Sequence, residues 1–212
     1  RTSLDEAMQL SRFRLRVPDP ELKHGQVEMV TINAKQCTLP TPWGMEGGFA
    51  VVYKFRTQSN QVRAVRVFKK TMPQDTCERY RLLGDYFSTH APKITVNFRY
   101  HEQGLKVVDP YGSDQHFSLI DMAWVEGVTL LEYVDGLCQQ RDRTRLKQLL
   151  EQWKGLYAQM QAAQIAHGDL AGGNVMVDPK DQKLVLIDYD GVYIPNFQGR
   201  SAFLAGQPSY QH

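Results

Sequence analysis

Three oxygen-bearing side chains flank a short predicted hairpin late in the sequence. Asp169 and Asn174 precede the apolar strand VMV, and Asp188 follows the apolar strand LVLI, with the polar turn DPKDQK between the strands. Because antiparallel strands joined by a turn bring their outer ends together, we expect the three side chains at one end of the hairpin. Their oxygens are hard ligands suited to Mg²⁺, and a further carboxylate can accept a proton from an attacking hydroxyl. A single aspartate is more often an ordinary turn residue, so it is the combination that indicates a site.

The sequence around these three residues resembles motifs of the protein-kinase-like superfamily. HGDLAGGN (167–174) is similar to its catalytic loop H-x-D-L-x-x-x-N, with every spacing kept, and IDYDG (187–191) is similar to its D-F-G region. The resemblance implies that Asp169 is the catalytic base and that Asn174 and Asp188 are the Mg²⁺ ligands. It also implies packing roles for His167 and Tyr189.

A glycine-containing hairpin lies in the place that the resemblance requires for ATP. GGFAVVYK (47–54) is similar to the family's glycine-rich strand-turn-strand, in which small side chains let backbone N–H groups approach phosphate oxygens. The resemblance implies that Gly47, Gly48 and Val52 contact the nucleotide. Met45 and Ala50 stand where the family has its other two glycines, and a Gly-Gly turn before a strand is also common in plain hairpins.

The next strand, VRAVRVF (62–68), places an arginine among apolar residues. By alternation, Ala64, Arg66 and Phe68 share one face of the strand. A buried arginine requires an anionic partner, so Arg66 is expected to meet phosphate, although a surface arginine without a role is the plain alternative. The resemblance puts Ala64 over the adenine and places Arg66 where the family has a lysine. It also makes Glu78, on the following helix, the partner of that cation.

Residues 120–130, IDMAWVEGVTL, resemble the segment that links the two lobes in this superfamily. The resemblance implies that Met122 is the gatekeeper and that the backbone of Ala123 and Val125 bonds the adenine. It further implies that Met176 forms the adenine floor. An apolar strand followed by a Glu-Gly turn is common, so this segment is informative mainly through its position.

Two departures from the protein-kinase pattern bear on the function. Gly168 replaces the arginine of H-R-D, so control by a phosphorylated activation segment is not expected. H-G-D is also similar to small-molecule kinases such as the aminoglycoside phosphotransferases. GQPSY (206–210) resembles the end of an activation segment, after which the helical remainder of the family's C-lobe does not follow, and we therefore expect a truncated C-lobe.

Periodicity predicts the supporting elements. Strands are expected over 49–55 and 62–68, with further strand pieces at 105–108 and 117–122. Helices are expected over 76–87 and within 143–163. In the second of these, the leucines, Trp153, Tyr157 and Met160 form one apolar stripe.

Composition narrows the class of protein. The 212 residues are 42% hydrophobic and 23% charged, with a net charge of +2, which is too balanced for a protein defined by binding nucleic acid or an anionic membrane. No apolar run approaches the length of a membrane span. The three cysteines are far apart and fit a reducing cytoplasm better than a disulfide framework. The N-terminus shows no initiator methionine or signal segment and is interpreted as a cut end.

These observations predict an α+β, bilobal protein-kinase-like fold with a small antiparallel-sheet N-lobe bearing one helix and a mainly helical C-lobe. The expected boundaries are an N-terminal extension (1–43), the N-lobe (44–122), and the hinge with a partial C-lobe (123–212). The expected function is transfer of the ATP γ-phosphate, with Mg²⁺, to a Ser/Thr hydroxyl of a protein, as in bacterial kinase-like proteins. A pseudokinase scaffold and a small-molecule kinase are the alternatives, and the oligomeric state stays open.

Overall fold

The computed structural model describes residues 2–34, 37–42, 44–109 and 111–200. The chain divides into two compact units. The first combines residues 1–81 with 98–124, and the second combines residues 82–97 with 125–212.

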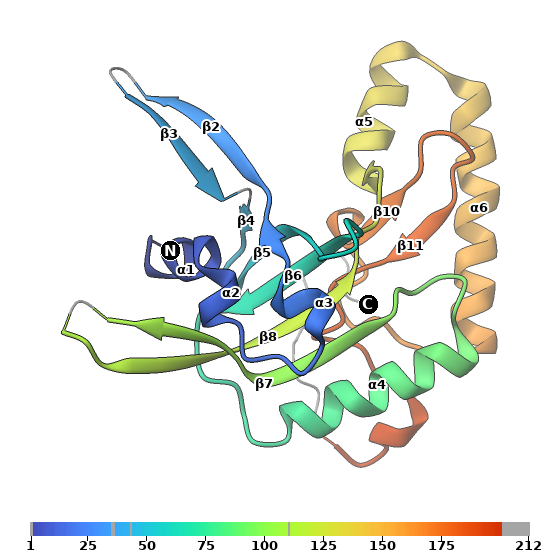
Figure 1. Ribbon diagram of the computed structural model, residues 1–212. Coiled ribbons are helices and arrows are strands. Elements are labelled where there is room, and N and C mark those ends of the chain that lie inside the picture. The colour runs from blue at the N-terminus through green and yellow to red at the C-terminus, as the bar shows by residue number, and fades with distance from the viewer. Residues whose placement is uncertain (1, 35–36, 43, 110, 201–212) are drawn as a thin grey trace. The chain divides into compact units, whose positions relative to one another are not determined.

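The first unit is built on an antiparallel sheet with the strand order β1-β5-β6-β8-β7, and β4 pairs with the outer part of β5 (Figure 1). The bounds are β1 Gln26–Val27, β4 Gly44–Glu46, β5 Ala50–Arg56, β6 Val62–Phe68, β7 Phe98–Val108 and β8 Asp114–Ala123. The predicted strand pieces at 105–108 and 117–122 are parts of longer strands. Two further strands, β2 (Met29–Ala34) and β3 (Cys37–Pro42), form a separate two-stranded hairpin.

One face of this sheet forms the core of the unit. Alternate residues of β5 and β6, such as Val51, Tyr53 and Val65, are fully buried there. They pack against apolar side chains of the first 27 residues, among them Met8 and Leu15. Those residues form three short helices: α1 (Thr2–Gln9), α2 (Ser11–Arg14) and α3 (Pro20–Lys23).

A buried carboxylate on this face links the N-terminal segment to the sheet. Asp121 is fully buried, contacts Arg63 and Arg99, and lies 2.7 Å from the ring nitrogen Nε2 of His101. Arg99 also pairs with Asp19, which caps α3. Burial raises the pKa of Asp121, but the hydrogen bond from His101 and the positive charges of Arg63 and Arg99 outweigh it and hold the pKa below its ordinary value.

The other face of the sheet is packed by helix α4 (Thr76–His90) through aromatic rings. The Tyr80 ring stacks on Tyr100 with centroids 5.2 Å apart and meets Phe98 edge-on at 5.9 Å. The helix predicted over 76–87 is therefore present, and Gly84 does not interrupt it.

The second unit holds two long helices and a small sheet. Helix α5 (Leu130–Gln140) begins at a capping box formed by Thr129 and Glu132, and α6 (Arg143–Ala162) begins at the N-cap Asp142. The sheet order is β11-β10-β9, and α6 runs beside β11 (Figure 1). The strands are β9 (Val128–Thr129), β10 (Val175–Val177) and β11 (Leu184–Leu186), with 3₁₀ turns η1 (Gly172–Asn174) and η2 (Pro195–Phe197).

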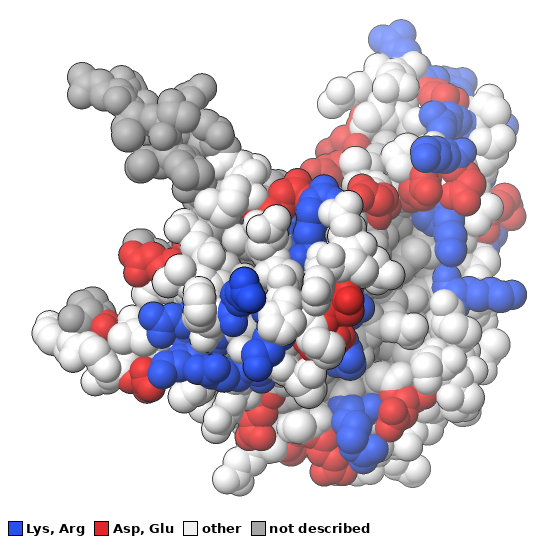
Figure 2. Space-filling model, in the orientation of Figure 1, with Lys and Arg blue, Asp and Glu red and all other residues white. Residues whose placement is uncertain are grey.

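The apolar stripe predicted on α6 is only partly buried. Leu149, Leu156 and Met160 are buried, whereas Leu150 and Tyr157 are about half exposed. The buried residues lie on the side of α6 that meets β11. The buried face of α6 therefore includes fewer residues than the apolar stripe that the sequence predicts. On the face drawn in Figure 2, basic and acidic side chains lie interspersed along α5 and α6.

The architecture confirms the predicted fold class, with an antiparallel-sheet unit and a mainly helical unit. Over the described ranges, no helix combines the length and apolar character needed to cross a membrane.

Candidate active site

The loop that leads to Asp169 is fixed by backbone contacts within the second unit. Ala166 exchanges two backbone hydrogen bonds with Tyr193, at 3.0 and 2.7 Å. Gly168 follows with φ +75°, and a Cβ on it would lie 2.1 Å from the carbonyl oxygen of Gly191. Only glycine fits this conformation at this distance from another backbone, which explains why the arginine of H-R-D is absent here.

Asp169 and Asn174 are joined directly by hydrogen bonds, which goes beyond the prediction that they lie at the same end of the hairpin. The Asn174 side-chain nitrogen Nδ2 donates to the Asp169 carbonyl oxygen at 2.8 Å and to its carboxylate Oδ2 at 2.9 Å. Between them, Ala171 N donates to Asp169 O and Asn174 N donates to Ala171 O. The loop therefore folds back on itself, and both half-buried side chains are held in one orientation.

Asp188 stands at the same end of the hairpin. Val175 pairs with Leu186 in the register of β10 and β11, and Ile187 N donates to Asn174 O at 2.9 Å just beyond that pair. Asp188 follows with φ +61°, which turns the chain sharply out of the strand. This left-handed conformation is uncommon for residues other than glycine and is often found at functional sites.

The buried side chains of His167 and Tyr189 stabilise the loop that carries Asp169 and the loop that carries Asp188. His167 Nε2 lies 3.0 Å from Ile187 O, and because a carbonyl only accepts, this nitrogen carries the proton. Burial lowers the pKa of His167, despite the opposing influence of that hydrogen bond and of the charges of Asp188 and Asp169. The ring is therefore neutral at pH 7 and acts in packing.

The Tyr189 side chain connects the loop after β11 to the segment that follows α4. Its hydroxyl donates to Leu186 O at 2.7 Å and accepts from Val96 N at 2.9 Å. Its ring meets Phe87 edge-on, with centroids 4.9 Å apart. Burial raises the pKa of Tyr189 far above its ordinary value. The aromatic partner Phe87 was not singled out in the sequence, where only its place on a helix was visible.

The donor atoms at this end of the hairpin fit Mg²⁺. Asn174 uses its nitrogen on Asp169, so its oxygen Oδ1 is the amide atom suited to a cation, and Asp188 adds a carboxylate. Mg²⁺ is commonly bound through one or two protein groups together with phosphates and water. No group of three His, Cys, Asp or Glu side chains suited to a metal occurs in the described part of the chain. A site here would thus rest on Asn174 and Asp188 with ligand oxygens.

In the first unit, four of the predicted nucleotide contacts share one face of the sheet. Val52 pairs with Arg66 across β5 and β6, and Ala64 pairs with Met122 across β6 and β8. Residues directly opposite one another share a face, and alternate residues of β6 do too, so all four side chains lie on the face opposite the buried core.

Arg66 is buried, with 8% of its surface exposed, and its guanidinium carbon lies 5.0 Å from the Phe68 ring centroid. The plain alternative of a surface arginine is therefore excluded. Lys54 also belongs to this face, because it pairs with Ala64, and its ammonium lies 5.1 Å from the Trp124 ring centroid and 3.6 Å from Glu28.

The glycine-containing hairpin is open to solvent. Gly47 and Gly48 are exposed, and Gly47 N donates to Ala50 O at 2.9 Å across the turn. A Cβ on Gly48 would meet no atom within 4 Å. Phe49 is 62% exposed, so the tip contributes little to the core.

A model of the phosphotransferase enzyme family matches residues 73–194, which is more than half of the chain. The chain belongs to this family. No curated protein matches it. Membership of the family supports the predicted kinase-like fold, but it identifies neither a Ser/Thr-kinase type nor the acceptor.

The match covers the loop around Asp169, Asn174 and Asp188, and it begins after β6. The glycine hairpin and Arg66 therefore lie outside the matched range. Their assignment to the nucleotide rests on the sequence pattern and on the shared sheet face.

The remaining predicted site residues are distributed over both units. Glu78 lies in the first turn of α4, and Ala123 ends β8. Val125 is the first residue of the second unit after that strand. Met176 is the half-buried central residue of β10, where it pairs with Thr129 and Val185. The pairing of Glu78 with Arg66 and the roles of Ala123, Val125 and Met176 toward adenine stay predictions. Residues 206–210 lie outside the described residues.

Proposed function

We propose that this protein transfers the γ-phosphoryl group of ATP to a hydroxyl acceptor, with Asp169 as the base. The observation that supports the proposal best is the pair of hydrogen bonds from Asn174 Nδ2 to Asp169, because they hold the carboxylate in a fixed orientation at the hairpin end. Membership of the phosphotransferase family supports the same reaction class.

In this mechanism the chain works mainly by positioning. Asp169 accepts the proton of the acceptor hydroxyl as the hydroxyl oxygen attacks the γ-phosphorus, and the bond from that phosphorus to the β,γ-bridging oxygen breaks to release ADP. Asn174 keeps the Asp169 carboxylate oriented during this step. Asn174 Oδ1 and the Asp188 carboxylate would hold Mg²⁺, which when bound neutralises negative charge on the phosphate oxygens. Gly168, packed on Gly191, fixes the backbone that delivers Asp169.

The nucleotide contacts proposed for the first unit are Arg66 and the sheet face that it shares with Val52, Ala64 and Met122. An arginine can bind a phosphate through two parallel N–H bonds, which is a different geometry from that of a lysine. The backbone N–H groups of Gly47 and Gly48 would add phosphate contacts.

The proposed acceptor is a Ser/Thr hydroxyl of a protein, supported by the similarity of the 120–130 segment to protein kinases. A small-molecule hydroxyl is the second candidate, and the family match and the H-G-D loop favour it. The close packing of Gly168 on Gly191 leaves no room for the arginine that protein kinases use there, which supports this candidate as well.

The test of the proposed reaction is turnover of radiolabelled ATP by the wild type and by Asp169→Asn. We expect the substitution to lower the rate about 10²- to 10⁴-fold, because the amide cannot accept the proton. Asp135→Asn, on an exposed position of α5, is the matched control and should keep the wild-type rate. Equal rates in all three proteins would remove Asp169 as the base.

Acceptor class is tested by offering generic Ser/Thr protein substrates in one arm and aminoglycosides and simple alcohols in the other. Label in protein favours the first candidate, and label in a small product favours the second. A wild type that turns over no ATP, and whose melting temperature Mg-ATP does not raise, would instead support an empty scaffold, because a ligand that binds the native state stabilises it.

A further inference from the structure

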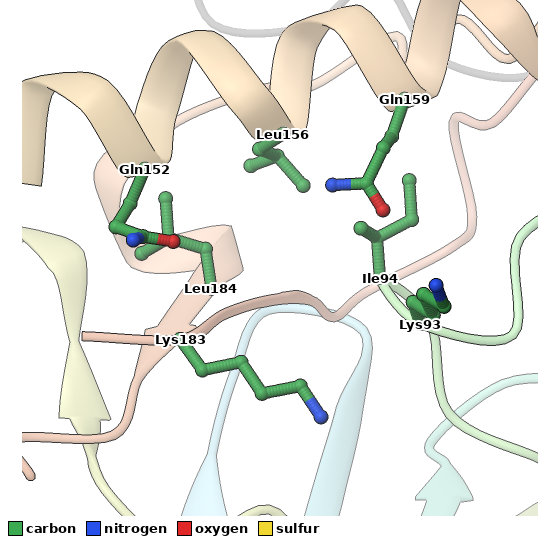
Figure 3. A pocket seen from close by; sticks show the side chains of 7 residues that line it. All are labelled: Lys93, Ile94, Gln152, Leu156, Gln159, Lys183 and Leu184. Atoms are coloured by element: carbon green, nitrogen blue, oxygen red, sulfur yellow. The ribbon is translucent and has the colours of Figure 1, made fainter. Parts of the chain in front are cut away.

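A cavity of about 200 Å³ lies in the second unit, on the side of β11 that faces α6 (Figure 3). Its apolar floor consists of Ile94, Leu156 and Leu184, which come from the segment after α4, from α6 and from β11. All three floor residues are at least 94% buried. None of the proposed phosphoryl-transfer residues lines the cavity.

The rim of the cavity is polar and positively charged. Lys93 and Lys183 line it and are exposed, and neither side chain forms an ion pair or hydrogen bond with any described residue. Gln152 and Gln159, one helical turn on either side of Leu156, complete the rim (Figure 3). No carboxylate lines the cavity, although the Asp181 carboxylate beside it accepts a hydrogen bond from the Lys183 backbone N–H at 2.9 Å, so the lining residues by themselves are positively charged.

We propose that this cavity is a binding site for a small organic anion, namely a carboxylate carrying a short alkyl chain. The two ammonium groups attract the carboxylate, and the apolar floor takes the chain. The glutamine amides can donate hydrogen bonds to the carboxylate, Gln159 through the N–H that it does not donate to Gly155 O. The volume equals that of about six or seven water molecules, which suits a chain of a few carbons. A large apolar ligand would not fit.

The floor is hydrogen-bonded to the strand that delivers Asp188. Leu186 N donates to Ile94 O at 2.8 Å, and two residues after Ile94 the Val96 N–H bonds the Tyr189 hydroxyl. A ligand seated on Ile94 and Leu184 therefore contacts one partner of this connection, Ile94, and the strand β11 that carries the other, Leu186. The binding site itself does not depend on the proposed reaction.

The experiment is a titration of the full chain with hexanoate, followed by calorimetry and by amide chemical shifts. We expect saturable binding with a dissociation constant on the order of 1 mM, with the largest shifts at Ile94 and Leu184. Hexylammonium, which has the same chain and the opposite charge, and acetate, which lacks the chain, should bind at least about tenfold more weakly.

Matched lysine variants distinguish binding in this cavity from nonspecific attraction of an anion to the positively charged surface. Lys93→Gln and Lys183→Gln should each weaken hexanoate binding about two- to fivefold and the double variant about tenfold, as expected for exposed charge pairs. Lys180→Gln, on the same hairpin turn but outside the cavity, should bind as the wild type does. All three positions are exposed, and the circular dichroism spectrum verifies that each of the four variants is folded.

Three results would overturn the proposal. They are no saturable hexanoate binding by the wild type, equal binding of hexylammonium, and wild-type affinity in the folded Lys93→Gln/Lys183→Gln variant. Weaker hexanoate binding at higher salt, together with unchanged affinity of Lys180→Gln, would support it.

Discussion

The loop that carries Asp169 and the glycine hairpin of the first unit are both short, glycine-containing segments, yet they are built in opposite ways. In the first, Gly168 lies against Gly191, and a Cβ there would be 2.1 Å from a carbonyl oxygen. In the second, a Cβ on Gly48 would meet nothing within 4 Å. The loop that carries Asp169 is held in place by the backbone packed against it. The glycine hairpin is held mainly by the hydrogen bond across its own turn.

This difference explains why one motif is clear in the sequence and the other is eroded. His167, Asp169, Ala171 and Asn174 each form a hydrogen bond within this region, and Gly168 lies against Gly191, so the spacing of H-x-D-L-x-x-x-N is determined by the packing. Met45 is 60% exposed and Phe49 is 62% exposed, so large residues are tolerated at the hairpin. The family match follows the same division, since it includes the first loop and not the second.

The sharpest test of this comparison is a pair of alanine substitutions. Gly168→Ala should destabilise the protein by about 2–4 kcal/mol, because it combines a left-handed backbone with a clash against another backbone. Gly48→Ala should change the free energy of unfolding by less than about 0.5 kcal/mol. Urea unfolding measures both, and equal effects would show that the two loops are constrained alike.

The second test removes one hydroxyl that holds the fixed loop. Tyr189→Phe deletes the bonds to Leu186 O and Val96 N and leaves both backbone groups without that partner. We expect a loss of about 1–3 kcal/mol in the free energy of unfolding. Tyr193→Phe is the control, since Tyr193 is 41% exposed and its hydroxyl bonds no described residue, and it should be near neutral. A loss of similar size in the control would assign the effect to general packing.

Much of the hairpin end that carries Asp169, Asn174 and Asp188 can be predicted from the sequence, because its contacts join residues that are close in the sequence. Asp169 and Asn174 are five residues apart, and antiparallel pairing of VMV with LVL then places Asp188 beside them. The strands over 49–55 and 62–68 and the helix over 143–163 are visible through periodicity alone.

What sequence reasoning missed depends on contacts between distant segments. The sequence pattern places the first 27 residues in an N-terminal extension, yet Met8 and Leu15 are completely buried on the sheet. The isolated charge of Asp121 in an apolar strand was a usable signal, because a buried carboxylate requires partners, but the sequence does not say that Arg63, Arg99 and His101 supply them. Gly168 was recognised as a departure, and only its φ and its neighbour Gly191 give the reason.

A third, smaller effect concerns pH. Burial lowers the pKa of His167 below its ordinary value of 6.5, so the unfolded chain takes up a proton at a pH where the folded protein does not. The stability contributed by neutral His167 is therefore complete above pH 6.5 and is lost as the pH falls, by up to about 1.4 kcal/mol per pH unit. His167→Gln should flatten the dependence of unfolding free energy on pH below 6.5. An unchanged slope would mean that His167 is protonated in the folded state.

The smallest effect is expected at the open hairpin itself. Lys69 Nζ lies 2.9 Å from Glu46 Oε1, and the lysine and glutamate side chains are 26% and 40% exposed. Exposed pairs of this kind contribute about 0–1 kcal/mol, so Lys69→Gln should lower the melting temperature by no more than about 3 °C. If the hairpin binds ATP phosphates, the same variant should raise KM for ATP a few-fold, because the bridge orders the turn, whereas Lys180→Gln should change neither quantity. A stability loss as large as that of Gly168→Ala would show that the hairpin is as constrained as the loop that carries Asp169, and the comparison would no longer explain the eroded motif.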